Sequence, residues 1–249
     1  ALADESFDII HSCHTIEHLA HPAKVLADHA RLLKPGGLLV LDAPNIAIIG
    51  AEDILEEWFI DKHLYHFSER TLTRMIEAAG FAIIQAPDPR DQINLLYVAR
   101  KTDAAKKSSF ADPAEAQTAQ SLMARYEYLR SENLGALSDA ARELVSLKPR
   151  RVAIWGAGRL FDSLVVHGGF DPGNLSLLID KHLKQHASER HGRTLSAPEE
   201  LNDANTDVVV VMSRGFAQEI MADARRRAPH AEIILYADLL ARARRRQAA

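Results

Sequence analysis

Residues 7–45 read FDIIHSCHTIEHLAHPAKVLADHARLLKPGGLLVLDAPN, and this stretch decides the fold. Its first seven residues form an apolar run with β-branched members, which predicts a strand buried on both faces. Pro22 suits the first turn of a helix, and the apolar residues after it recur at helical spacing. Residues 34–37, KPGG, end that helix, and residues 38–41 predict a second central strand. The order strand, helix, strand predicts half of a nucleotide-binding α/β sheet.

Composition sets outer bounds on the function. The chain has 249 residues, of which 47% are hydrophobic, enough for one large or two ordinary domains. It contains no apolar run long enough to cross a membrane. Its net charge of −4 gives no electrostatic case for nucleic acid. The single cysteine, Cys13, fits a reducing compartment. We therefore expect a cytoplasmic protein with neither a membrane nor a nucleic-acid partner, and its oligomeric state is left open.

The next segments continue the sheet. Residues 45–57 form a long connection that is expected to be partly helical. Ser68 is expected to cap a helix that ends at Gly80. Residues 81–85 and 94–100 predict two adjacent strands with no helix between them. Such a pair suggests an antiparallel hairpin that closes one edge of a mostly parallel sheet.

A second α/β region follows a polar linker. Residues 101–112 are small and polar, and a helical region then runs to about residue 147, with a break expected near Gly135. Alternation of strands and helices beyond Arg151 predicts a parallel sheet, with strands expected at 152–155, 175–179, 208–212 and 233–236. The expected division is a first domain at residues 1–102, a helical linker at 103–149 and a second domain at 150–249.

One short motif points to a different function. Residues 14–18, HTIEH, match the H-x-x-E-H signature of inverted zinc proteases, which needs both histidines on one helical turn beside the metal. Here the motif follows a predicted buried strand, and a five-residue match arises easily by chance. The carboxyl end of a strand is also where open α/β sheets bind ligands. We therefore expect no metal at this position.

The whole first segment resembles the second half of a class I S-adenosylmethionine-dependent methyltransferase. The resemblance rests on Phe7-Asp8 in the first strand, the Glu-His-Leu turn at 17–19, the LLKPGG helix end at 32–37 and the FS…L…IEAAGF pattern at 67–81. It covers residues 1–100 and implies S-adenosylmethionine as the cofactor. Cys13 and His14, at the end of the first strand, would line the cofactor or acceptor side of the cleft.

The same resemblance implies a fold class, and the sequence departs from the family pattern at one point. The fold class is α/β: a partial Rossmann-like methyltransferase sheet with its first strands missing, plus a second small Rossmann-like domain. The family's Gly-rich cofactor loop and its ribose-holding acid do not precede Phe7. We therefore expect this sequence to be the C-terminal portion of a longer enzyme, and to bind the cofactor weakly on its own.

The best catalytic candidates lie in residues 61–68, DKHLYHFS. The segment resembles the HEHLSYFS stretch of sugar C-methyltransferases, and His63 falls on the second histidine of that motif, which implies a general base. Asp61 and Lys62 replace the first histidine and the glutamate. His66 is the second candidate, because an imidazole near neutral pKa can remove a proton. The alternative is that these side chains only pack the loop.

The second domain opens with a partial dinucleotide fingerprint. Gly156 and Gly158 follow a predicted strand, and Asp180 ends the next one at the spacing of a ribose-binding acid. Phe161 occupies the position of the third glycine. The arrangement also resembles the C-terminal domain of sugar C-methyltransferases, so a structural or substrate-covering role competes with nucleotide binding. The histidines that follow are expected to be solvated, at positions 182, 186 and 191.

The sequence therefore predicts methyl transfer from S-adenosylmethionine to a small polar acceptor such as a sugar or a nucleotide-sugar. Two alternatives remain open at this point. One is a non-catalytic nucleotide-binding or scaffold module. The other is an NAD(P)-dependent oxidoreductase, which rests on Gly156, Gly158 and Asp180 alone.

Overall fold

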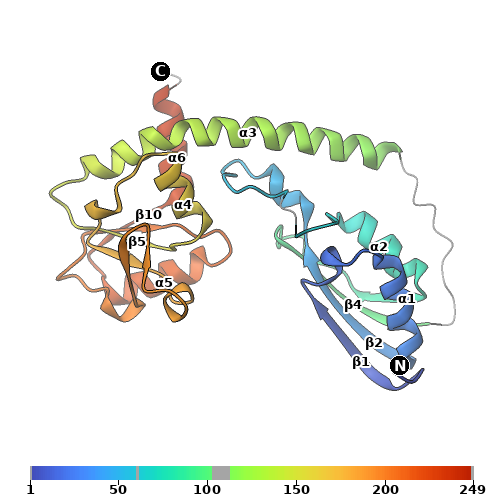
Figure 1. Cartoon of the computed structure of the whole chain (residues 1–249). Coiled ribbons are helices and arrows are strands. Elements are labelled where there is room, and N and C mark those ends of the chain that lie inside the picture. Colours follow the sequence, from blue (N-terminus) through green and yellow to red (C-terminus); the bar gives the residue numbers. More distant parts are fainter. Residues whose placement is uncertain (1, 60–61, 103–112, 248–249) are drawn as a thin grey trace. The chain divides into compact units, whose positions relative to one another are not determined.

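The computed structural model describes residues 2–59, 62–102 and 113–247 (Figure 1). Contacts divide the chain into two compact units. The first unit comprises residues 1–51 and 57–124, and the second comprises residues 52–56 and 125–249. The bounds differ from the ranges expected from sequence, because the helix α3 (Pro113–Ser146) is shared between the units and residues 52–56 pack with the second.

The first unit contains a four-stranded sheet in the order β1-β2-β4-β3. Strands β1 (Phe7–Cys13) and β2 (Leu33–Pro44) are parallel. Strand β4 (Asn94–Lys101) runs antiparallel to β2 and to β3 (Phe81–Gln85). The predicted antiparallel pair therefore exists, with β3 at the edge and β4 inserted beside the parallel strands.

The prediction that β1 is buried on both faces is wrong. Among the described residues β1 pairs with β2 alone, so it forms an edge of the sheet. Phe7 is 37% exposed and Ile9 is 58% exposed. An apolar run predicts a strand correctly here, but it does not reveal how many neighbours that strand has.

Two helices cover one face of this sheet. Helix α1 (Pro22–Leu32) and helix α2 (Glu69–Ala78) contribute Leu26 and Leu72 to a core that also holds alternate side chains of β2 and β4. Ser68 caps α2, as predicted, because its hydroxyl accepts a hydrogen bond from the Thr71 amide. Two 3₁₀ turns, Ile16–His18 and Ile46–Gly50, follow β1 and β2.

The second unit is the predicted parallel α/β sheet, with six strands in the order β10-β9-β5-β6-β8-β7. All neighbouring pairs are parallel except β7 and β8. Sequence reasoning missed these two short polar strands. The strands are β5 (Val152–Trp155), β6 (Leu177–Ile179), β7 (Glu189–Arg190), β8 (Arg193–Ser196), β9 (Val208–Val211) and β10 (Glu232–Leu235).

Helices cover both faces of the second sheet. Helices α4 (Arg159–Val166) and α6 (Tyr236–Gln247) pack in one apolar cluster, and α5 (Ala217–Arg227) packs in another. Short 3₁₀ turns connect the elements at Pro172–Asn174, Leu183–Gln185 and Pro198–Glu200. Along the chain that the structure describes, no helix is both long and apolar enough to span a membrane.

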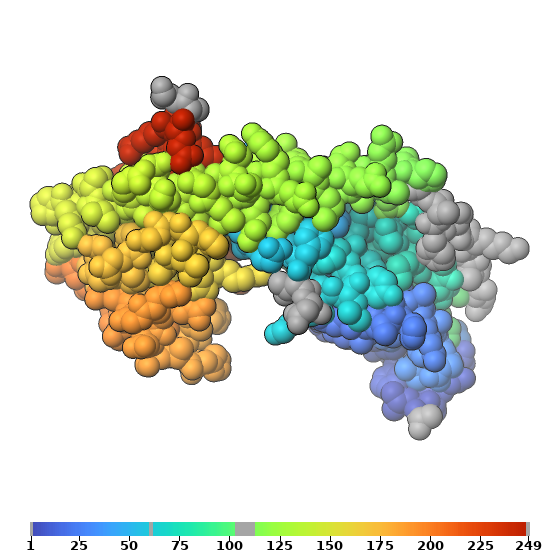
Figure 2. Space-filling model, turned by 45° about the horizontal axis from the view of Figure 1, so that its top comes forward, coloured from blue at the N-terminus to red at the C-terminus, as the bar shows by residue number. Residues whose placement is uncertain are grey.

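Helix α3 is continuous through Gly135, so the predicted break is wrong. A glycine lowers helix propensity by about 1 kcal/mol, and packing easily outweighs that cost. Its second half buries one stripe at helical spacing, which includes Leu129, Leu137 and Leu144. The helix lies at the surface in Figure 2. Tyr128, in its first half, is 64% exposed.

Candidate functional site

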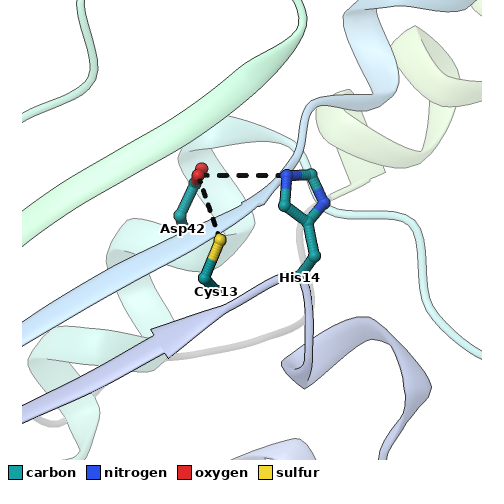
Figure 3. Close-up of side chains that lie close together, drawn as sticks. All are labelled: Cys13, His14 and Asp42. Carbon is teal, nitrogen blue, oxygen red and sulfur yellow. Dashed lines mark hydrogen bonds and ion pairs between the residues drawn. The ribbon is translucent and has the colours of Figure 1, made fainter. Parts of the chain in front are cut away.

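The first candidate site lies where β1 and β2 end. Parallel register places Cys13 directly opposite Asp42. The Cys13 thiol donates a hydrogen bond to Asp42 Oδ2 over 3.7 Å, and His14 Nε2 lies 3.9 Å from the same oxygen. Figure 3 shows the two side chains converging on the carboxylate from adjacent residues. The sequence thus predicted correctly that these groups lie at the carboxyl ends of neighbouring strands.

Backbone and electrostatics distinguish the two β1-end residues. Burial and the nearby Asp42 carboxylate raise the pKa of the Cys13 thiol, so it remains a neutral donor at pH 7. His14 adopts a left-handed backbone with φ of +44°. A non-glycine residue in that region carries strain and often marks a functional site. The structure brings Cys13 and His14 together, and their role in cofactor binding stays a prediction.

Glu17 is the most unusual side chain in this region. It is 1% exposed, and neither of its carboxylate oxygens has a hydrogen-bond partner among the residues that the structure describes. Two imidazole nitrogens face Oε1: His14 Nδ1 at 3.7 Å and His18 Nε2 at 3.6 Å. A buried carboxylate without hydrogen bonds is costly, so an arrangement of this kind calls for a ligand, a proton or a cation.

Backbone hydrogen bonds attach the predicted catalytic loop to Glu17. The Glu17 carbonyl accepts bonds from the amides of Leu64 and Tyr65, at 2.9 and 3.1 Å. This attachment brings the His63 ring to the His18 ring, with the centroids 4.8 Å apart and the planes 71° apart. His66 lies next along the loop, 5.9 Å from His63 between ring centroids. Asp61, which was discussed above with Lys62 as a departure from the motif, lies outside the described residues.

His66 is set up to be neutral. Burial and the neighbouring His63 lower the pKa of its imidazole. The Phe59 ring packs edge-on against it, with the centroids 4.8 Å apart. A neutral imidazole at pH 7 can accept a proton, which is what a general base requires. The catalytic roles of His63 and His66 stay predictions.

Sequence reasoning did not predict that Glu17 and His18 lie together with His63, because it treated the HTIEH motif as a chance match. The helical turn that an H-x-x-E-H zinc site needs does not form, because only residues 16–18 make a 3₁₀ turn. The HTIEH motif already contained two of the three grouped residues, Glu17 and His18. Its third partner, His63, lies 45 positions beyond His18, a distance that short motifs do not span.

The second candidate site is a cavity of about 470 Å³ in the second unit. It opens at the carboxyl ends of β5, β6 and β9, the point where the strand order reverses around β5. Open α/β sheets bind ligands at such points. Three acidic residues, Asp180, Glu219 and Asp223, line it together with Lys181 and His182. This excess of carboxylates does not favour a phosphate-bearing ligand.

The partial dinucleotide fingerprint has a structural explanation. Asp180 Oδ2 accepts a hydrogen bond from the Ala157 amide, and Oδ1 accepts bonds from the amides of His182 and Leu183. A Cβ on Gly156 would lie 2.4 Å from the Met212 carbonyl oxygen. The acid and the first glycine therefore hold the loop itself, which supports the structural alternative over nucleotide binding.

The histidines of the 182–191 loop are exposed, as expected. One of them also has a partner, because His191 Nε2 lies 2.8 Å from Asp162 Oδ1. Arg190 forms an ion pair with the same carboxylate. The pairing arises because the β7–β8 hairpin, which the sequence did not predict, brings both side chains to helix α4.

Comparison with known proteins agrees with the methyltransferase interpretation of the first unit. Residues 2–86 match a family model described as a methyltransferase domain. Ubiquinone biosynthesis O-methyltransferase of Parvibaculum lavamentivorans is 44% identical over 62 residues, which is 22% of this chain and 24% of that protein. The Maricaulis maris protein of the same name is 36% identical over 67 residues, 24% of this chain and 26% of that protein.

A solved S-adenosylmethionine-dependent methyltransferase from Mesorhizobium loti is also similar, with a TM-score of 0.32 and 17% identity over 39% of this chain and 64% of that one. The chain spans about a quarter of the length of the two curated relatives. The family match covers residues 2–86 and agrees with the methyltransferase resemblance of that segment.

Proposed function

We propose that the first unit contributes to methyl transfer from S-adenosylmethionine to a small polar acceptor. The observation that carries the proposal is the group of titratable side chains at the ends of β1 and β2, inside the segment that matches a methyltransferase domain. When bound, the cofactor supplies an electrophilic methyl group. The protein's task is then to orient the acceptor and to remove its proton.

The side chains at the strand ends fit a cofactor or acceptor with polar groups. Asp42 Oδ1 is buried and has no hydrogen-bond partner, so it is available to a donor on the ligand. Cys13 occupies the other oxygen of this carboxylate and helps to hold it in place. Asp42, Cys13 and His14 are accordingly the residues that we propose to hold the cofactor.

Proton removal falls to the histidines of the loop. His66 has a lowered pKa and lies beside His63, so the pair offers a neutral imidazole at pH 7. As the acceptor oxygen takes the methyl group, the sulfur–methyl bond would break and S-adenosylhomocysteine would leave, while the acceptor O–H proton would pass to the imidazole. General-base catalysis of this type contributes about 10²- to 10⁴-fold to a rate.

The acceptor is proposed by class. The resemblance of residues 61–68 and of the second unit to sugar C-methyltransferases supports a sugar or nucleotide-sugar. The curated relatives are ubiquinone biosynthesis O-methyltransferases, which supports oxygen as the methylated atom. Both acceptor types carry hydroxyl groups, so the shared feature that we propose is an ionisable hydroxyl.

The test is methyl transfer by the protein in its natural full length, with a panel of sugars, nucleotide-sugars and other small molecules that carry an ionisable hydroxyl. We expect His66→Ala to lower kcat by about 10²-fold or more without weakening the binding of S-adenosylhomocysteine. His21→Ala, which removes an exposed histidine of the same unit, is the matched control. Absence of S-adenosylhomocysteine binding, or full turnover by His66→Ala, would contradict the proposal.

A further inference from the structure

We propose that Glu17, His18 and His63 form a binding site for a divalent transition-metal cation. Among the described residues, the potential ligand atoms of these three side chains all lie within 4.8 Å of one another. The site is distinct from the H-x-x-E-H pattern, which would use both His14 and His18 as ligands and Glu17 as a base. Here the carboxylate is itself a ligand, and the third ligand comes from the distant loop.

Distances within the group suit a small cation. His18 Nε2 and Glu17 Oε1 are 3.6 Å apart, too far for a hydrogen bond. Ligand atoms around a tetrahedral zinc ion lie about 3.4 Å apart, since each bond is about 2.0–2.1 Å long. The pair is therefore already spaced as two ligands of one ion would be.

The hydrogen bonding of His18 also supports a metal site. Its Nδ1 lies 2.6 Å from the Lys62 carbonyl oxygen, which can only accept a hydrogen bond, so Nδ1 carries the proton. In a neutral imidazole the lone pair is then on Nε2, the nitrogen that faces Glu17. Metal-binding histidines are typically fixed in this way, by donation from the second ring nitrogen to a carbonyl.

Glu17 supplies the independent observation. Its carboxylate is buried and accepts no hydrogen bond from the described residues, yet it faces the Nε2 lone pair of His18, whose side chain is 38% exposed. A buried carboxylate facing a lone pair is stabilised by a positive charge between the two groups. A metal ion there would be bound by both groups and within reach of the His63 imidazole, whereas a proton would join only Glu17 and His18.

The donor set selects the type of metal. Two imidazole nitrogens and one carboxylate suit zinc and its transition-metal neighbours better than magnesium or calcium, which prefer oxygen ligands. Three protein ligands also leave a coordination position open. If the proposed methyl transfer is correct, an acceptor hydroxyl is the natural occupant of that position. This last role rests on the proposed function, whereas the metal site does not.

A second group of potential metal ligands consists of Cys13, His14 and Asp42. It is the weaker candidate because its cysteine already donates to Asp42 and has a raised pKa, so it resists forming the thiolate that a metal needs. Variants at the two groups distinguish them.

The experiment is zinc titration of metal-free protein by calorimetry, with cobalt absorption as a second measurement of the ligand set. We expect one zinc ion per chain, and about a 100-fold loss of affinity in both Glu17→Gln and His63→Ala. His21→Ala should bind zinc unchanged, and circular dichroism should show that each variant is folded. Cys13→Ser should also bind zinc unchanged.

Three results would overturn the site: absence of stoichiometric zinc binding, unchanged affinity in the double variant Glu17→Gln/His63→Ala, or a loss caused by Cys13→Ser alone. S-adenosylhomocysteine binding by the metal-free protein is measured separately. Failure of that measurement would count against the proposed methyl transfer and leave the zinc result standing.

Discussion

The ends of the two sheets carry acidic side chains in opposite states. In the second unit, Asp180 accepts three backbone hydrogen bonds and holds its own loop. In the first unit, Glu17 is buried beside two histidines, and its oxygens accept no hydrogen bond from the described residues. A satisfied carboxylate stabilises a fold, whereas an unsatisfied one is a cost that function must justify. The comparison indicates chemistry in the first unit and loop structure at the glycine-rich turn of the second.

The largest effect should come from Gly156→Ala. The added Cβ would lie 2.4 Å from the Met212 carbonyl oxygen at a backbone φ of +113°, so we expect the free energy of unfolding to fall by about 3 kcal/mol. Gly158→Ala is the control, because its Cβ would meet no atom within 4 Å. Chemical denaturation measures both. A Gly156→Ala protein as stable as the control would mean that the loop glycine serves a ligand after all.

The next effect concerns Asp180. Replacing it with alanine leaves the amides of Ala157, His182 and Leu183 without their acceptor, so the free energy of unfolding should fall by about 2 kcal/mol. Titration with NAD(H) and NADP(H) of the unmodified protein should give no saturable binding. Tight binding that Asp180→Ala abolishes would reverse the comparison and restore the dinucleotide interpretation.

Glu17→Gln should raise the free energy of unfolding, whereas the two changes above lower it. In metal-free buffer it removes a buried carboxylate that accepts no hydrogen bond from the described residues, so we expect the free energy of unfolding to rise by about 1 kcal/mol. Glu200→Gln is the matched change at a satisfied carboxylate, which accepts a hydrogen bond from the Ala197 amide, and it should be destabilising. Loss of stability in both variants would show that Glu17 is held by interactions like those of Glu200.

The smallest effect concerns the reactivity of Cys13. Burial and Asp42 raise the pKa of the thiol, so at pH 8 a smaller fraction is thiolate than in an ordinary cysteine. Asp42→Asn removes the negative neighbour, lowers that pKa and should speed alkylation by iodoacetamide about threefold. Asp8→Asn is the control, because Asp8 is an exposed acid on β1, the strand that carries Cys13. An unchanged rate in Asp42→Asn would show that the carboxylate does not act on the thiol.

Local chemistry explains how much of the fold could be predicted. Pro22, Ser68 and Gly80 mark helix boundaries because each has a backbone or capping property that acts within a few residues. The runs at 7–13 and 152–155 were recognised as strands for the same reason. The exposure of β1 was not predicted, because burial depends on neighbours that the run itself does not specify. The hairpin of β7 and β8 was missed because its strands are short and polar.

The sequence by itself determined the strand and helix order, the methyltransferase resemblance of the first unit, and the placement of Cys13 and His14 at a strand end. It could do so because hydrophobic period and turn chemistry are local properties. Only the tertiary structure decided that Glu17 is buried without a hydrogen-bond partner among the described residues, and that the His63 ring lies against the His18 ring. These facts depend on hydrogen bonds between the Glu17 carbonyl and the loop amides of Leu64 and Tyr65, which no local pattern encodes.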